Sequence, residues 1–482
     1  MPQSASKRFI RASFCSFFGT ALQIAIFSLC MLTGTSISHA QETALRIHGA
    51  DVSYLEELEA SGAVFKEDGV ADDLFSIFAR NGINTIRLRL WHTPAEGWYD
   101  LESTIGLAKR ARDAGMDVLL DFHYSDTWAD PGKQFKPAAW DGLPFEILRD
   151  SLYAYTNAVV SAMSAENVLP AYVQVGNETS QGMLWDDGRV GGSFNNATQW
   201  SKLRTLFSDA IRAIRDAPGG DTIQIILHTD RGGDVGGATW FFDNITSTGT
   251  VDFDMIGLSY YPWWHGTLAE MEQTVNTVAS KYRKPVLLAE TGYPWTLQWY
   301  DNTNNLVGLP EHLLPGYENL PDAQYTFLRD VLSVMENIPE GRGAGISYWA
   351  PEAIAVPGVG SVWENVALFD NEGELLPAIT AFAERTSTSQ ENEEALLELS
   401  FEVFPNPTRN MFDIQYTQPT AGVLSISLYD VLGRRVKQIV DQRWIAAGQH
   451  QFEVMVSDVP AGSYLCIVDG PSGRTLRRVA VW

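Results

Sequence analysis

The stretch Tyr172-Val-Gln-Val-Gly-Asn-Glu178 combines the two features that decide the fold. It begins as a short run rich in apolar, β-branched residues, typical of a buried strand, and it ends in an amide and a carboxylate. Alternation places Gln174 and Glu178 on one face, while Val173 and Val175 face the opposite way, toward packed helices. We therefore expect a strand of a parallel sheet whose carboxyl end opens onto a polar site.

This pattern recurs along the chain between Arg46 and Phe382. Segments with helical spacing, such as Leu101 to Ala114, follow the strands, and glycines stand where the helices stop. Eight strand–helix units over about 340 residues predict an α/β fold, a (β/α)8 TIM barrel. An open doubly wound sheet is the alternative, but no glycine-rich phosphate fingerprint follows the first strand. The predicted strands are Arg46 to Ala50, Thr85 to Trp91, Asp117 to Tyr124, Ala171 to Glu178, Thr222 to His228, Phe253 to Tyr261, Pro285 to Glu290 and Gly343 to Trp349.

The N-terminal residues 1–40 have the features of a signal peptide. Lys7, Arg8 and Arg11 precede an apolar run from Phe14 to Leu32, and small residues follow up to Ala40. An uncleaved membrane anchor is the alternative, because the run is nearly long enough to cross a bilayer. No later segment is both long and apolar enough to do so, so we expect a secreted or cell-surface protein with no stable span after signal removal.

The rest of the chain divides by composition. We expect a barrel over residues 41–384, an acidic linker over 385–400 that is too polar to form a core, and a small all-β sandwich over 401–482. Strands in the last part are predicted at Val423 to Tyr429, Gln451 to Val456 and Ser463 to Val468.

Charge and cysteine content restrict the partners. Loss of the signal peptide removes three positive charges and no acids, so the formal charge falls from −25 to −28. Nucleic acids, anionic membranes and polyanionic substrates would be repelled, which favours a neutral polymer or small molecule. Cys15 and Cys30 leave with the signal, and Cys466 alone cannot form an intrachain disulfide.

Two glutamates end predicted strands and are candidates for catalysis. Glu178 ends the fourth strand and Glu290 ends the seventh, Val286-Leu-Leu-Ala-Glu290. Counting alternate residues groups Glu290 with Leu288 and Val286, which directs both carboxylates to the barrel mouth. Two converging carboxyl groups can cleave a glycosidic bond. For either residue alone, helix capping or a salt bridge at the barrel rim is the alternative.

Arg87 and Arg89 share a face of the second strand, Ile86-Arg-Leu-Arg-Leu-Trp91. Both are expected to need carboxylate partners, since an unpaired buried charge is costly. An arginine beside the nucleophilic glutamate would hold it ionised. A purely structural ion pair deeper in the barrel is the alternative.

Histidines and aromatic residues also stand at strand ends. His123 and His228 could bind a metal, but no Glu or His lies at close ligand spacing, so hydrogen bonds to sugar hydroxyls fit better than zinc. Flat aromatic rings suit stacking on a pyranose. The aromatic residues at or just beyond strand ends are Trp91, Trp128, Trp263, Trp264, Trp295, Trp299, Trp349, Tyr260, Tyr261 and Tyr293.

Taken in register, several segments between residues 49 and 378 resemble glycoside hydrolase family 53, the arabinogalactan endo-β-1,4-galactanases. The Tyr-Ser-Asp-Thr-Trp-Ala-Asp-Pro run that ends at Pro131 is specific, whereas a lone Asn-Glu would be weak. The matching segments are Gly82 to Trp91, Asp121 to Pro131, Gln174 to Glu178, Gly257 to Pro262 and Ala289 to Pro294.

This resemblance implies a retaining endo-hydrolase of β-1,4-galactan, the neutral side chain of pectin, that requires no cofactor. It implies Glu178 as acid/base, Glu290 as nucleophile and Asn177 as a ligand of the sugar 2-hydroxyl. Retention needs carboxyl groups about 5 Å apart, and we expect a raised pKa for Glu178 and a lowered pKa for Glu290. The subsite residues would be Arg87, Arg89, His123, His228, Tyr260 and Trp349, with Trp91, Trp128 and Trp295 as further sugar contacts.

The chain departs from the family in two loops. Some relatives bind calcium after the seventh strand through several carboxylates, but here that loop, Trp299 to Asn305, has a single acid. Calcium is thus unsupported, with Asp301, Asn302, Asn304 and Asn305 as weak candidate ligands. After the eighth strand the sequence reads Tyr348-Trp-Ala-Pro-Glu352, where the family pattern has a glutamate directly after the tryptophan.

The C-terminal part resembles a type IX secretion sorting domain through Phe404-Pro-Asn-Pro407, Leu428 to Arg434 and Pro460-Ala-Gly-Ser-Tyr464. The resemblance implies the type IX secretion machinery as a partner. A carbohydrate-binding module is the alternative, although Trp444 is its main aromatic candidate. For the barrel, the alternatives are a related glycosidase acting on mannan, glucan or xylan and a non-catalytic surface glycan-binding protein.

Overall fold

The structure is a computed structural model, and it describes residues 45–95, 97–383, 400–418, 421–430, 434–446, 448–471 and 473–482. The predicted signal peptide and residues 385–399 of the predicted linker lie outside this range. Among the described helices, none has the length and apolarity needed to cross a membrane.

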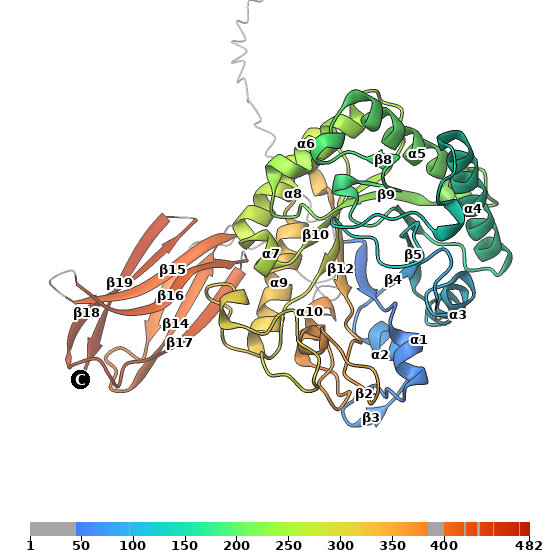
Figure 1. Cartoon of the computed structure of the whole chain (residues 1–482). Coiled ribbons are helices and arrows are strands. Elements are labelled where there is room, and N and C mark those ends of the chain that lie inside the picture. Colours follow the sequence, from blue (N-terminus) through green and yellow to red (C-terminus); the bar gives the residue numbers. More distant parts are fainter. Residues whose placement is uncertain are drawn as a thin grey trace, which may run out of the picture. The chain divides into compact units, whose positions relative to one another are not determined.

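The predicted barrel is confirmed: eight parallel strands close on themselves in the order β1-β12-β11-β10-β9-β6-β5-β4 (Figure 1). Every predicted strand forms, with ends shifted by a few residues. Small differences at strand ends are normal, because pairing and not propensity sets them. The bounds are β1 Ile47–Asp51, β4 Thr85–Leu90, β5 Asp117–Phe122, β6 Tyr172–Val175, β9 Gln224–Thr229, β10 Met255–Tyr260, β11 Val286–Thr291 and β12 Gly343–Trp349.

Alternation along the strands separates two layers of side chains. In β6, Val173 and Val175 pack in the main core between strands and helices, as predicted, whereas Tyr172 faces the barrel interior. The interior is closed by a small apolar layer, above which the lining turns polar. This layer contains Ile47, Leu119, Tyr172, Ile226, Met255, Leu287, Ala289 and Ala344.

Helices cover the outside of the barrel (Figure 1). Several start at a side chain that accepts a backbone N–H, among them Asp100 before α3 and Thr267 in a capping box before α8. Gly115, just after α3, has φ +78°, which favours glycine and stops the helix. The helices are α1 Leu55–Ala60, α2 Leu74–Arg80, α3 Leu101–Asp113, α4 Phe145–Ala165, α5 Ala197–Arg215, α6 Val235–Thr246, α7 Pro262–His265, α8 Leu268–Tyr282, α9 Asp322–Glu336 and α10 Thr380–Ala383.

Short strand pairs decorate the loops: β2 Lys66–Glu67 pairs with β3 Val70–Ala71, and β7 Gly182–Met183 with β8 Gly188–Arg189. The second pair comes after the turn and the short 3-10 helix Thr179–Gln181 that follow β6.

The C-terminal residues form two antiparallel sheets, so the predicted all-β fold is confirmed. Their order is β13-β14-β17 and β16-β15-β18-β19. Alternate residues such as Phe412 and Ile414 from one sheet, and Ile426 and Leu428 from the other, share a separate apolar core. The strands are β13 Ser400–Phe404, β14 Met411–Gln418, β15 Gly422–Asp430, β16 Arg435–Ile445, β17 Gly448–Met455, β18 Gly462–Gly470 and β19 Gly473–Val481.

Candidate active site

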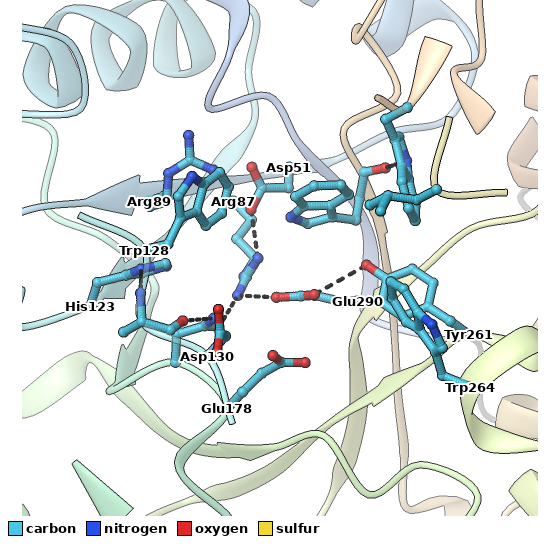
Figure 2. Close-up of a pocket in the computed structure, with 15 residues that line it drawn as sticks. Asp51, Arg87, Arg89, His123, Trp128, Asp130, Glu178, Tyr261, Trp264 and Glu290 are labelled. Carbon is cyan, nitrogen blue, oxygen red and sulfur yellow. Dashed lines mark hydrogen bonds and ion pairs between the residues drawn. The ribbon is translucent and has the colours of Figure 1, made fainter. Parts of the chain in front are cut away.

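A pocket of about 210 Å³ opens at the carboxyl ends of the barrel strands (Figure 2). It collects side chains from strands and loops that are far apart in the sequence, as expected for this fold. Its lining consists of Asp51, Arg87, Arg89, His123, Trp128, Ala129, Asp130, Asn177, Glu178, Tyr261, Trp264, Glu290, Leu306, Trp349 and Trp363.

Glu178 reaches the pocket because the chain turns sharply after β6. Gly176 has φ +82° and Glu178 itself has φ +46°, so both residues adopt left-handed backbone. A Cβ on Gly176 would lie 2.6 Å from Cγ2 of Thr179, so glycine is required on steric grounds as well. The buried Gln134 amide donates to the Asn177 carbonyl at 2.7 Å and holds this turn in place.

Glu290 reaches the pocket through an irregularity in β11. The prediction that Val286, Leu288 and Glu290 share a face is wrong, because Val286 and Leu288 pack in the helix-facing core. In the pairing with β10, the register shifts after Leu288 so that Glu290 stands opposite Ser259. Such an extra residue re-aims the following side chain, and it turns the carboxylate inward.

The two predicted catalytic carboxyl groups therefore meet. One oxygen of Glu178 and one of Glu290 lie within 4.8 Å of each other. Glu178 Oε1 accepts from the Ser259 hydroxyl at 2.7 Å. Glu290 accepts from Arg87 Nη2 at 3.0 Å and from the Tyr261 hydroxyl at 3.1 Å (Figure 2). Within the described part of the chain, Glu290 thus has two side-chain donors, one of them charged, and Glu178 has a single neutral one.

Arg87 is the centre of the charge network. Its guanidinium, 1% exposed, pairs with Asp51 at 2.6 Å, Asp121 at 2.9 Å and Glu290 at 3.0 Å. These residues come from β4, β1, β5 and β11, so one cation joins four strands. Burial opposes the charged form, but Asp121, Glu290 and Asp51 outweigh it and raise the pKa of Arg87.

Replacing Arg87 with methionine is expected to lower the free energy of unfolding by about 3–5 kcal/mol, because buried carboxylates would lose their common partner. Urea unfolding followed by circular dichroism measures this loss. The matched control is Arg80→Met, since Arg80 pairs with Glu67 and Asp72 at an exposed site and should contribute no more than about 1 kcal/mol. Equal losses in the two variants would contradict the central role of Arg87.

The two carboxyl groups differ in proton affinity. Burial, followed by the charges of Glu290 and Asp230, raises the pKa of Glu178 well above its ordinary value, as predicted. The predicted lowering for Glu290 is wrong: burial raises its pKa to about 7, although Arg87 acts against this. Because Arg87 and Tyr261 donate to Glu290, this group ionises first and the proton remains on Glu178.

The pH profile should reflect this order. If Glu290 is the nucleophile, as predicted, we expect kcat/KM of the wild type to fall as the pH drops through about 7, because Glu290 is then protonated. The alkaline limb should follow ionisation of Glu178 at higher pH. Initial rates across the pH range at low substrate concentration measure both limbs. An acid limb near pH 4 would contradict the raised pKa of Glu290.

Arg89 does not follow the prediction that both arginines have carboxylate partners. Its guanidinium carbon lies 3.9 Å from the ring centre of Trp128 and 4.2 Å from that of Tyr99, and Tyr54 and Trp91 complete the cage. Cation–π contacts with four rings compensate the buried charge. Its Nε and Nη2 atoms have no hydrogen-bond partner in the described part of the chain.

The prediction that Tyr260 lines the pocket is wrong, because its neighbour Tyr261 occupies that place. Tyr260 is fully buried, donates to the Gly266 carbonyl at 2.8 Å and stacks on Phe327 of α9, so it belongs to the outer layer. Its neighbour Tyr261 faces the pocket and contacts Glu290. Adjacent strand residues point in opposite directions, which could have identified Tyr261 from the inward Ser259.

His123 and Asn177 line the pocket as predicted, but their polar atoms are used within the protein. His123 Nε2 contacts Asp121 at 3.1 Å, and Nδ1 accepts the Ala129 N–H at 3.0 Å. Asn177 donates to the Ala129 carbonyl at 2.9 Å and accepts from Arg87 at 3.0 Å. Both residues therefore fix the wall of the pocket in the free protein.

Other predicted residues lie behind this wall. Trp91 stacks near Arg89 and donates to His123, while Trp295 donates to the Glu364 carbonyl at 3.1 Å. His228 is fully buried beside Glu178. Trp128 and Trp349 do line the pocket. Asp51, which the catalytic-site prediction omitted, ends its strand with a carboxylate, the same signal that identified Glu178. In all, the prediction omitted seven lining residues: Asp51, Ala129, Asp130, Tyr261, Trp264, Leu306 and Trp363.

The four weak calcium candidates differ in exposure and in their hydrogen-bond partners. Asp301 already accepts the N–H groups of Thr303 and Ser361, and Asn302 and Asn304 point into solvent. Asn305 donates to Glu364 at 3.4 Å. A calcium ion needs six to eight oxygen ligands, so this loop does not support one.

The comparisons with known proteins agree with this geometry. Residues 47–382 match the family model described as Glycosyl hydrolase family 53, and residues 402–481 match the Secretion system C-terminal sorting domain. The second match indicates a protein that is secreted or attached to the cell surface.

Relatives are similar over the barrel. The arabinogalactan endo-beta-1,4-galactanase of Cellvibrio japonicus is 37% identical over 69% of this chain and 89% of its own length. The endo-beta-1,4-galactanase of Bacillus subtilis is 36% identical over 68% and 75%. The solved GH53 catalytic domain of Ignisphaera aggregans is 35% identical, has a TM-score of 0.65, and is matched over 70% of this chain and 95% of its own. By the family match and these relatives, the chain belongs to glycoside hydrolase family 53.

Proposed function

We propose that the protein is a secreted, retaining endo-β-1,4-galactanase that cleaves the neutral galactan side chains of pectin. The observation that carries the proposal is the approach of Glu178 and Glu290 oxygens to within 4.8 Å in a pocket lined by tryptophans. Carboxyl groups about 5 Å apart leave no room for a water molecule between the second carboxylate and the anomeric carbon, which favours retention. The named relatives supply the substrate class.

In the first step, Glu178 donates its proton to the glycosidic oxygen. Glu290 attacks the anomeric carbon at the same time, so the leaving chain departs as an alcohol and a glycosyl-enzyme ester forms. Arg87 and Tyr261 hold the Glu290 carboxylate in line and stabilise its charge until the new bond forms.

In the second step, Glu178 acts as base. It takes a proton from water, whose oxygen attacks the anomeric carbon and releases Glu290 as a carboxylate. Every proton and bond in this scheme is handled by the two glutamates and water, so we propose that no cofactor is required.

The remaining parts support delivery to the substrate. We propose residues 1–40 as signal peptide, 41–384 as catalytic barrel, 385–400 as linker and 401–482 as the domain read by the type IX machinery. Stacking of sugar rings on Trp128, Trp264 and Trp349 would bind a neutral chain without charged contacts.

The direct test measures reducing ends released from galactan, mannan, glucan and xylan, with the anomer of the first product followed by NMR. Galactan should be cleaved fastest, and the β anomer should appear first. Cleavage of another polysaccharide in preference would replace the substrate assignment, and tight galactan binding without hydrolysis would indicate a binding protein.

A further inference from the structure

Ser259 connects the acid/base glutamate to a histidine that does not reach the substrate pocket. Its hydroxyl lies 2.7 Å from Glu178 Oε1 and 2.9 Å from His228 Nε2. Ser259 and His228 are both fully buried, so neither exchanges these partners for bulk water. A hydroxyl carries one proton, and the ring nitrogen therefore decides where that proton points.

The surroundings of the other ring nitrogen indicate the tautomer. His228 Nδ1 lies 3.3 Å from the Glu178 N–H, which can only donate, and 3.1 Å from Asn177 Oδ1. That oxygen already accepts from Arg87 at 3.0 Å and from Gln174 at 3.1 Å, which uses both of its lone pairs. Nδ1 is therefore the acceptor of the Glu178 N–H, and the ring proton sits on Nε2.

With this tautomer the hydrogen bonds run in one direction. The Nε2–H group of His228 donates to Ser259 Oγ, and the Ser259 hydroxyl then has to donate to Glu178. The ring stays neutral, since burial, and then Arg87, lower the pKa of His228 well below its ordinary value. A donor chain that ends on a carboxylate stabilises its ionised form.

We propose that Ser259 and His228 are positioning residues that stabilise the ionised form of Glu178 and so make it available as the base in the second step. This rests on the proposed function. Burial favours the protonated form of Glu178, which the first step needs. The hydrogen bond from Ser259 partly offsets this effect, so that the same carboxyl group can act in both steps.

Other groups around Glu178 act alongside this pair. Glu290 from β11 and Asp230 after β9 favour the protonated form, whereas Arg87 from β4 favours the ionised one. Tyr261 from β10 donates to Glu290 and not to Glu178. Around His228, Arg87 and His123 favour the neutral ring, and Asp121 favours the charged one. None of these groups donates a hydrogen bond to the Glu178 carboxylate, as Ser259 does.

Replacement of Ser259 with alanine tests the proposal in the full-length protein. The loss of a hydrogen bond to a charged group should move the alkaline limb of the kcat/KM profile up by about one pH unit, while the acid limb set by Glu290 stays in place. The matched control is Ser347→Ala, since Ser347 is a buried serine on β12 whose hydroxyl has no hydrogen-bond partner among the residues that the structure describes. This variant should keep the wild-type profile.

Two substitutions of His228 distinguish the effect of its hydrogen bond to Ser259 from the effect of its packing. His228→Gln can place an amide N–H near the former Nε2 and should keep most of the wild-type alkaline limb, whereas His228→Leu should move it upward. Combining His228→Leu with Ser259→Ala should add little to the serine variant, because the histidine acts through that hydroxyl.

An unmoved or lowered alkaline limb in a folded, active Ser259→Ala variant overturns the proposal, and so do fully additive effects in the double variant. A wild type that does not hydrolyse galactan overturns the proposed function instead. The two failures are therefore distinguishable.

Discussion

Glu290→Ala is expected to lower kcat on β-1,4-galactan by at least about 10⁴-fold, because loss of a nucleophile removes the covalent route. Arg87 and Tyr261 would then lose the carboxylate to which they donate in the wild type. With an activated aryl β-galactoside, added azide should enter the vacated side of the sugar and give α-galactosyl azide. Reducing-end assays and NMR of the azide product measure the two outcomes.

The matched control for this variant is Glu166→Ala, because Glu166 is an exposed acid after α4 that pairs with Lys109 at 2.7 Å and does not line the pocket. It should retain wild-type activity. Intact galactan hydrolysis by Glu290→Ala would show that another residue attacks the sugar.

Glu178→Ala is expected to lower the rate on galactan by about 10²–10⁴-fold, the usual contribution of a general acid. The loss in the first step should be much smaller for aryl galactosides whose leaving group needs no proton. Azide should then react with the accumulated glycosyl-enzyme and give β-galactosyl azide, because Glu290 still occupies the opposite face. Single-turnover release of the aryl group and NMR of the azide product test this. An α product would reverse the two assignments.

The fold could be predicted from the sequence because its signals are local and repeated. Each barrel strand is a short apolar run with a polar end, and glycines such as Gly115 stop the helices between them. Strand ends were less accurate: the predicted Ala171 to Glu178 ends at Val175, because the positive φ of Gly176 breaks the pairing. Glycine is needed at this position because a Cβ would clash with Thr179. Such a tertiary contact cannot be derived from residue propensities.

The site was predicted where simple alternation holds and missed where it fails. Arg87 and Arg89 lie on a regular strand and both face the pocket. The predicted partners of Arg89 were wrong because four aromatic rings from three loops surround it, and that assembly exists only after folding. The raised pKa of Glu290 was missed for a similar reason, since the extent of burial cannot be counted along a strand.

The register shift in β11 makes the position of the proposed nucleophile, Glu290, depend on backbone spacing as well as on residue identity. If Val286–Thr291 were grafted onto a barrel with a regular seventh strand, Ala289 would stay inward and Glu290 would enter the helix-facing layer. Chimeras within this family should therefore exchange β10 and β11 as one unit, with the mismatch between Leu258 and Ser259 kept intact.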